Sequence, residues 1–260
     1  MDMGLKGKVA LVAGASKGLG KAVALGLARE GAHIAILSRD AARIESAAKE
    51  IRGAQVLALV ADVSRAAGIQ RAVDETAKKF GTIHIVVTNA GGPPPGVFVS
   101  LTDEQWLSAV DATLMSAVRL SRAAIPLMQK QKWGRIIHLG SLTIKQPYAD
   151  LMLSNSIRAA VVGLAKTQAN ELAKDGILVN TVSPGIIETD RVVQLMESRA
   201  KRNGTTARDE YALAEKNVPL GRVGQPEEFA NVVVFLASER AAFVTGTHII
   251  VDGGETRTPF

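Results

Sequence analysis

Short β-branched runs alternate with longer amphipathic segments from one end of the chain to the other. Seven runs are nearly continuous in apolar residues, as strands covered on both faces should be: Lys8–Ala13, His33–Leu37, Gln55–Val60, Ile83–Thr88, Arg135–Leu139, Leu178–Val182 and Thr247–Val251. The pattern predicts helices over Leu19–Glu30, Ala41–Arg52, Arg65–Phe80, Asp103–Gln129, Ser156–Lys174 and Glu227–Leu236. Because this alternation implies right-handed crossovers between parallel strands, we expect an α/β protein with a doubly wound, seven-stranded parallel sheet and helices on both faces.

Two segments interrupt this rhythm. No linker or repeat divides the 260 residues, so we expect one domain over residues 1–260. Residues 91–96 read Gly-Gly-Pro-Pro-Pro-Gly and are incompatible with a helix, whereas residues 188–220 are long, polar and irregular, with a helix around Arg191–Lys201. In an open α/β sheet ligands bind beyond the carboxyl ends of the strands, where both segments are expected. We interpret residues 188–220 as a substrate lid, with an inert excursion as the alternative.

A glycine-rich turn follows the first predicted strand and leads into a helix. Residues 14–20 read Gly-Ala-Ser-Lys-Gly-Leu-Gly, a G-x-x-x-G-x-G spacing. Glycines permit the tight turn and a close backbone approach, and the free N–H groups at a helix start attract a pyrophosphate. The strand–turn–helix context therefore indicates a dinucleotide-binding site.

This spacing resembles that of the short-chain dehydrogenase/reductase family, and the resemblance continues through nearly the whole chain. The general layout is most similar to that of the 3-oxoacyl-carrier-protein reductases. The resemblance implies a Rossmann-type fold, a nicotinamide dinucleotide and a small-molecule carbonyl or alcohol substrate. It also implies an adenine contact by Asp62 and a final D-G-G element at residues 252–254. The residues that it assigns to the cofactor are Gly14, Ser16, Lys17, Gly18, Leu19, Gly20, Ser38, Arg39, Asp62, Val63, Asn89, Ala90, Gly91, Arg158, Pro184, Gly185 and Ile187.

The end of the second predicted strand distinguishes the two nicotinamide cofactors. An acidic residue there binds the free ribose 2′-OH of NAD(H), whereas arginine accommodates the 2′-phosphate of NADP(H). Ser38 and Arg39 suit the phosphate, and Lys17 adds a second cation. Asp40 would repel the phosphate if its side chain pointed inward, but it is also suited to cap the helix that starts at Ala41. The sequence therefore favours NADP(H) over NAD(H).

The catalytic positions depart from the family pattern. The family uses a serine, a tyrosine, a lysine four residues after the tyrosine, and an asparagine. Ser141 matches the serine, but Ser154 and Arg158 stand at the tyrosine and lysine positions, and Thr113 stands at the asparagine position. A serine hydroxyl is a poor general acid near neutral pH, and arginine does not exchange protons as an amine does.

Two interpretations of these replacements remain open. One is a divergent oxidoreductase in which Tyr148, in the loop before the helix, substitutes as acid, although a tyrosine there is more often a wall or packing residue. The other is a cofactor-binding protein with little or no turnover, such as a redox sensor or a partner subunit. Because nicotinamide itself supplies the hydride, turnover does not require the full set of family residues.

Composition excludes several other classes. The absence of cysteine removes disulfides and thiolate chemistry, and four histidines without ligand-like spacing give no metal site. The net charge of +6 comes from dispersed Lys and Arg without interleaved aromatics, which suits a polyanionic cofactor better than nucleic acid. No apolar stretch reaches the ~18 residues of a membrane span, and the first residues lack a signal-peptide pattern. We therefore expect a cytoplasmic protein, and the resemblance implies a homodimer or homotetramer.

Overall fold

Seven parallel strands form one sheet in the order β3-β2-β1-β4-β5-β6-β7 in the computed structural model, which describes residues 2–258. The strands are β1 Val9–Ala13, β2 His33–Ser38, β3 Val56–Val60, β4 Ile85–Thr88, β5 Gly134–Leu139, β6 Ile177–Pro184 and β7 His248–Val251. This confirms the predicted doubly wound sheet. The strand order reverses between β1 and β4, and such a switch point opens a crevice at the carboxyl ends of the strands.

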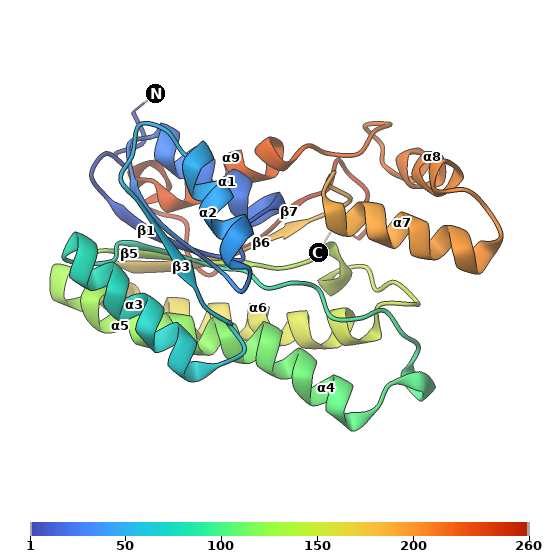
Figure 1. Ribbon diagram of the computed structural model, residues 1–260, viewed down its shortest axis with the longest axis horizontal. Helices are drawn as coiled ribbons and strands as arrows, with labels where there is room; N and C mark the ends of the chain where they lie inside the picture. The colour runs from blue at the N-terminus through green and yellow to red at the C-terminus, as the bar shows by residue number, and fades with distance from the viewer. Residues whose placement is uncertain (1, 259–260) are drawn as a thin grey trace.

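Helices cover both faces of the sheet (Figure 1). One layer holds α1 Gly18–Arg29, α2 Ala41–Glu50 and α9 Pro226–Ala237, and the other holds α3 Ala66–Phe80, α5 Ser116–Gln131 and α6 Met152–Leu172. Because the side chains of successive strand residues point to opposite faces of the sheet, β1 contributes side chains to the core under each helix layer. Ala10 and Val12 pack in the core under the first layer, whereas Leu11 and Ala13 pack in the core under the second.

The prediction of one continuous helix over Asp103–Gln129 is wrong, because a π-helical turn divides this segment into two α-helices. α4 Asp103–Ala109 begins with a capping box between Thr102 and Gln105, and a π-helical turn over Val110–Met115 then leads into α5. The apolar pattern runs on across the interruption, so the sequence does not reveal it. π-helical turns often mark functional sites, and this one carries Thr113, a buried hydroxyl without a hydrogen-bond partner among residues 2–258.

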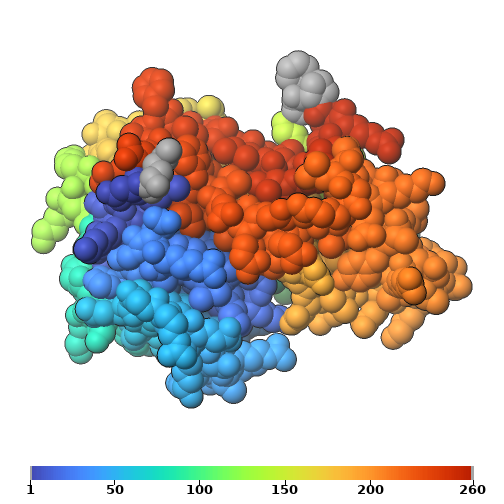
Figure 2. Space-filling model, turned by 90° about the horizontal axis from the view of Figure 1, so that it is seen from above, coloured from blue at the N-terminus to red at the C-terminus, as the bar shows by residue number. Residues whose placement is uncertain are grey.

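Residues 188–220 contain two helices rather than one helix in an irregular segment. α7 Asp190–Asn203 ends at Gly204, whose φ of +68° favours glycine. α8 Ala207–Asn217 begins with a reciprocal capping box, in which Asp209 N donates to Thr206 Oγ1 (3.2 Å) and Thr206 N donates to Asp209 Oδ2 (3.0 Å). The two helices form a lobe to one side of the sheet, orange in Figures 1 and 2.

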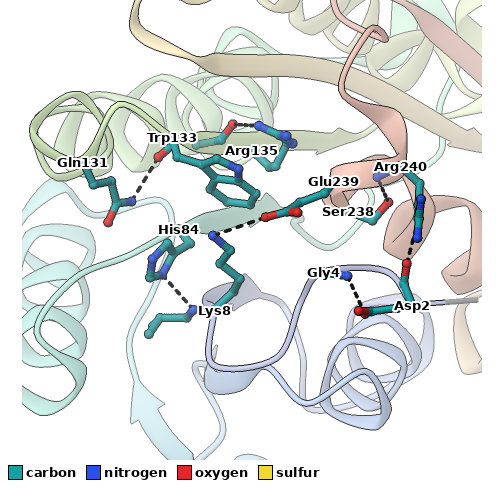
Figure 3. Close-up of polar contacts among 12 residues, drawn as sticks. Asp2, Gly4, Lys8, His84, Gln131, Trp133, Arg135, Ser238, Glu239 and Arg240 are labelled. Atoms are coloured by element: carbon teal, nitrogen blue, oxygen red, sulfur yellow. Dashed lines mark hydrogen bonds and ion pairs between the residues drawn. The ribbon is translucent and has the colours of Figure 1, made fainter.

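At the amino-terminal ends of the strands, two cationic side chains pack against the indole ring of Trp133 (Figure 3). Lys8 Nζ lies 4.1 Å from the ring centroid of Trp133, and the guanidinium carbon of the buried Arg135 lies 4.2 Å from it. Lys8 also pairs with Glu239 at 3.8 Å, and His84 Nδ1 accepts from the backbone N–H of Val9. These contacts join β1, β5 and the residues after α9 at the edge opposite the crevice.

His138, on β5, makes the stability of the fold dependent on pH. It is fully buried, with Nδ1 2.8 Å from Thr88 Oγ1 and Nε2 3.0 Å from Gln168 Oε1, and burial lowers its pKa to about 4. An unfolded histidine titrates near pH ~6.5, so the unfolded chain binds more protons between these values and stability falls as the pH drops through this window. We expect a loss of about 3 kcal/mol below the window, measured by urea unfolding. His138→Gln should lower stability at neutral pH, where it removes the buried hydrogen bonds, and should reduce the loss of stability at low pH; unchanged pH dependence would refute this assignment.

Candidate active site

A cleft of about 600 Å³ opens at the carboxyl ends of the strands, between the glycine-rich turn and α7. It brings together all of the predicted site residues except Gly20, which is not part of its lining. The predicted residues that line the cleft are Gly14, Ser16, Lys17, Gly18, Leu19, Ser38, Arg39, Asp62, Val63, Asn89, Ala90, Gly91, Ser141, Tyr148, Ser154, Arg158, Pro184, Gly185 and Ile187.

The glycines of the turn at residues 14–20 each meet a different backbone requirement. Gly14 and Gly18 have φ values of +58° and +55°, a region that L side chains rarely adopt. A Cβ on Gly20 would lie 2.4 Å from the Gly14 carbonyl oxygen, so α1 starts directly against the turn. Asn89 Nδ2 donates to the same carbonyl at 3.3 Å and fastens the end of β4 to the turn. The start of α1 therefore points free N–H groups into the cleft, as pyrophosphate binding requires.

The edge of the cleft after β2 is open to an anion. Ser38 Oγ donates to Ser16 Oγ at 3.1 Å, and Arg39 is an exposed residue of the lining. Asp40 caps α2, because its Oδ1 accepts from Arg43 N (3.0 Å) and its Oδ2 lies 3.2 Å from Arg43 Nε. The capping role that the sequence suggested for Asp40 is thus confirmed, and its carboxylate is engaged with Arg43.

Lys17 makes a contact that the sequence did not predict. Its Nζ lies 2.7 Å from Asp190 Oδ2, at the start of α7, so an ion pair crosses from the glycine-rich turn to residues 188–220. Lys17, which we expected to add a second cation near the ribose phosphate, is therefore paired with Asp190. Aspartate–lysine pairing between distant loops leaves no periodic signal in the sequence.

Asp62, after β3, is held as an ionised acceptor. Its Oδ1 accepts from Ser64 N (2.9 Å) and from Ser64 Oγ (2.8 Å). Although partial burial opposes ionisation, these hydrogen bonds and the charges of Arg39 and Arg65 lower the pKa of Asp62. A carboxylate in this state can accept from an amino group in the cleft.

Three hydroxyl groups form a connected chain at the end of β5. Ser141 Oγ accepts from Thr143 N (3.2 Å) and from Thr143 Oγ1 (3.0 Å), and Thr143 Oγ1 lies 3.2 Å from Ser154 Oγ. Since Thr143 has one hydroxyl hydrogen and gives it to Ser141, Ser154 must donate to Thr143. The hydrogen of Ser141 is then free to donate into the cleft. Thr143 was not predicted, because only the short helical turn after Ser141 brings it between the two serines.

Arg158, on α6, places a permanent positive charge behind these hydroxyls. Its Nη1 donates to the carbonyl oxygens of Leu139 and Gly140 at 3.1 Å each, which fixes the guanidinium at the end of β5. Burial, followed by the charge of Arg191, lowers the pKa of Arg158 to about 10, so the group stays protonated at neutral pH. It supplies charge and hydrogen-bond donors but no exchangeable proton.

Tyr148 lines the cleft but has its hydroxyl engaged. The hydroxyl donates to Oε1 of Glu255, a buried residue just after the D-G-G element. Burial and this carboxylate raise the pKa of Tyr148, and burial also raises the pKa of Glu255. The guanidinium of Arg199, on α7, lies 5.4 Å from the tyrosine ring centroid. Sequence reasoning missed Glu255, which no motif distinguishes from other acidic residues.

These features define a dinucleotide-binding protein of the Rossmann type, and known proteins narrow the class. The sequence model of the family described as Enoyl-(Acyl carrier protein) reductase matches residues 14–256. The 3-oxoacyl-[acyl-carrier-protein] reductase FabG of Pseudomonas aeruginosa is 38% identical over 254 residues, which cover 97% of this chain and 98% of that protein.

Solved structures of the same class superpose closely. The L-sorbose reductase of Gluconobacter frateurii, complexed with NADPH and L-sorbose, has a TM-score of 0.94 and 37% identity, covering 99% of this chain and 100% of that one. A short-chain type dehydrogenase/reductase from Mycobacterium marinum has a TM-score of 0.89 and 33% identity, covering 99% and 98% of the two chains. This chain therefore belongs to the short-chain dehydrogenase/reductase family.

Residues 2–258 offer neither a cluster of metal ligands nor a helix suited to a membrane. No group of three or more His, Asp or Glu side chains there lies close enough together to hold a metal ion. None of the helices in that range combines the length and the hydropathy needed to cross a bilayer.

Proposed function

We propose that this protein is an NADP(H)-dependent oxidoreductase that interconverts a small carbonyl compound and its alcohol. The observation that carries the proposal is the Ser141 hydroxyl, whose hydrogen is available to a ligand and which lies in the same cleft as the glycine-rich turn and Arg39. The preference for NADP(H) is supported by Arg39 and by the engagement of Asp40 with Arg43. The NADPH complex of the related L-sorbose reductase also supports it.

The proposed chemistry divides between the cofactor and the chain. The nicotinamide supplies or accepts the hydride when the cofactor is bound. Ser141 donates a hydrogen bond to the substrate oxygen, and the fixed charge of Arg158 stabilises the negative charge that develops there. In the reduction, protons shift together along the three hydroxyls, from Ser141 to that oxygen, from Thr143 to Ser141 and from Ser154 to Thr143, so that no serine has to ionise as a free acid. Solvent supplies the last proton, so one hydride and one proton are added to the carbonyl.

We assign Tyr148 to the wall of the substrate site rather than to proton transfer. A phenol whose hydroxyl is bonded to Glu255 and whose pKa is raised is a poor proton donor near neutral pH.

We also propose that residues 1–260 form one domain in which residues 188–220 act as a lid. Two contacts at the base of α7 support the lid: Lys17 with Asp190, and Arg191 Nη2 with the Pro93 carbonyl oxygen (3.0 Å).

A specific observation favours a second function. Ser154 and Arg158 replace the usual tyrosine and lysine of the family, and a cofactor-binding sensor or partner subunit has no need of an efficient acid. The two functions are separated by measuring NADPH consumption with a panel of ketones and aldehydes, alongside NADPH binding followed by fluorescence. We expect tight binding and turnover of at least one carbonyl class. Tight binding without turnover of any panel member would replace the enzyme proposal with the sensor proposal.

A further inference from the structure

Two arginines without acidic partners approach the same part of the cleft. Arg158 is buried at the end of β5, and Arg191, in the first turn of α7, is an exposed residue at the cleft mouth. Within residues 2–258, neither guanidinium lies within ion-pair distance of a carboxylate, although the adjacent Asp190 is paired with Lys17. The cleft mouth therefore presents a cation that nothing in the described chain neutralises.

Arg191 is held in place by the loop after β4. Its Nη2 donates to the carbonyl oxygen of Pro93 at 3.0 Å. Its guanidinium also packs over Gly92, where an added Cβ would lie 3.2 Å from Nε and 3.3 Å from Nη2. The loop at residues 91–96 contains three consecutive prolines, so it is a stiff support. The remaining donors of the planar guanidinium are thereby oriented in advance for a ligand.

The electrostatics of the pair favour a ligand of negative charge. Burial lowers the pKa of Arg158, and the charge of Arg191 lowers it further, so the two like charges act on each other. An anion between or beside them relieves this repulsion and compensates the lost hydration. The glycine-rich turn that suits the cofactor's pyrophosphate follows β1, whereas the Arg191 guanidinium packs against the loop after β4, so a separate anion is the ligand that we consider for Arg191.

We propose that Arg191 binds a carboxylate of the substrate, so that the carbonyl compound reduced at Ser141 is an oxo acid. This inference rests on the proposed carbonyl reduction. A guanidinium matches a carboxylate with two parallel hydrogen bonds, which gives orientation as well as affinity. With the carboxylate on Arg191 and the carbonyl oxygen on Ser141, the substrate is fixed at two points. Arg191 is thus the residue that selects charged over neutral carbonyl compounds.

The kinetic test compares short-chain 2-oxo and 3-oxo acids with their methyl esters. The wild-type protein should show a lower KM for the acids, and Arg191→Met should raise that KM by about 10- to 30-fold with little change for the esters. Arg191→Lys should keep part of the preference for acids that Arg191→Met loses, because lysine has the positive charge but cannot make the two parallel hydrogen bonds of a guanidinium. The control Lys201→Met removes an exposed charge from the same helix and should behave as the wild type. Equal KM values for acids and esters in the wild type would overturn the proposal.

A second measurement does not depend on turnover. Binding of the corresponding saturated carboxylic acids to the NADPH-loaded protein is followed by calorimetry, and Arg191→Met should weaken it by a similar factor. The Kd for NADPH should change by less than about threefold. An equal loss of NADPH affinity would assign Arg191 to the cofactor instead. If no carbonyl compound is turned over, carboxylate binding lost in Arg191→Met would still support the site while the proposed function fails.

Discussion

Replacing Ser141 by alanine should lower kcat for carbonyl reduction by ~10²–10⁴-fold while NADPH binds as tightly as in the wild type. Among the hydroxyl groups of Ser141, Thr143 and Ser154, only that of Ser141 does not donate its hydrogen to another of the three. Its loss therefore removes the donor to the substrate oxygen. Single-turnover reduction, measured as the loss of NADPH absorbance with enzyme in excess, isolates this step from product release.

The control for Ser141→Ala is Ser156→Ala, which removes an exposed hydroxyl from α6 two residues after Ser154. It should leave both kcat and NADPH binding unchanged. A Ser141→Ala protein with a rate within threefold of the wild type would remove Ser141 from the chemistry. In that case Tyr148 or a water molecule would have to supply the hydrogen bond.

The fold could be predicted because its signals are local. Each strand is a short apolar run, and the glycine-rich turn carries its conformation in residues that tolerate positive φ, such as Gly14 and Gly18. The start of α6 shows the limit of such signals. The helix begins at Met152, four residues before the predicted start at Ser156. The sequence does not mark this start, because the N-cap residue is Leu151, whose side chain cannot cap a helix.

The site could be predicted where it follows strands or where the family pattern marks positions on α6, such as Ser154 and Arg158. The cofactor residues after β1, β4 and β6 lie together because carboxyl ends of parallel strands meet at one edge. Thr143 was missed because only the short helical turn after Ser141 places it between the two serines. Asp190 and Glu255 were missed because their roles depend on contacts between segments that are far apart in sequence. Asp190 is 173 residues from Lys17 and Glu255 is 107 residues from Tyr148. The basic composition suggested an anionic ligand but did not single out Arg191.

Replacing Arg39 by alanine should raise the Kd for NADPH by about 30- to 150-fold, the loss of ~2–3 kcal/mol expected for hydrogen bonds to a charged group. The Kd for NADH should change by less than about threefold, because its ribose offers no phosphate at this edge. The reason lies in the neighbouring side chains: Asp40 is engaged by Arg43, and Lys17 by Asp190, so Arg39 is left as the cation that meets the 2′-phosphate.

Arg52→Ala is the matched control for Arg39, because it removes the same charge from an exposed position just after α2. If the general positive field attracted NADPH, both variants would weaken binding alike, and raising the salt concentration would remove the difference from the wild type. If Arg39 contacts the phosphate, only Arg39→Ala will lose affinity, and its ratio of NADPH to NADH affinity will fall. Equal losses for the two cofactors in Arg39→Ala would refute the phosphate assignment and shift the role of Arg39 to the adenine side of the cleft, where its charge already acts on Asp62.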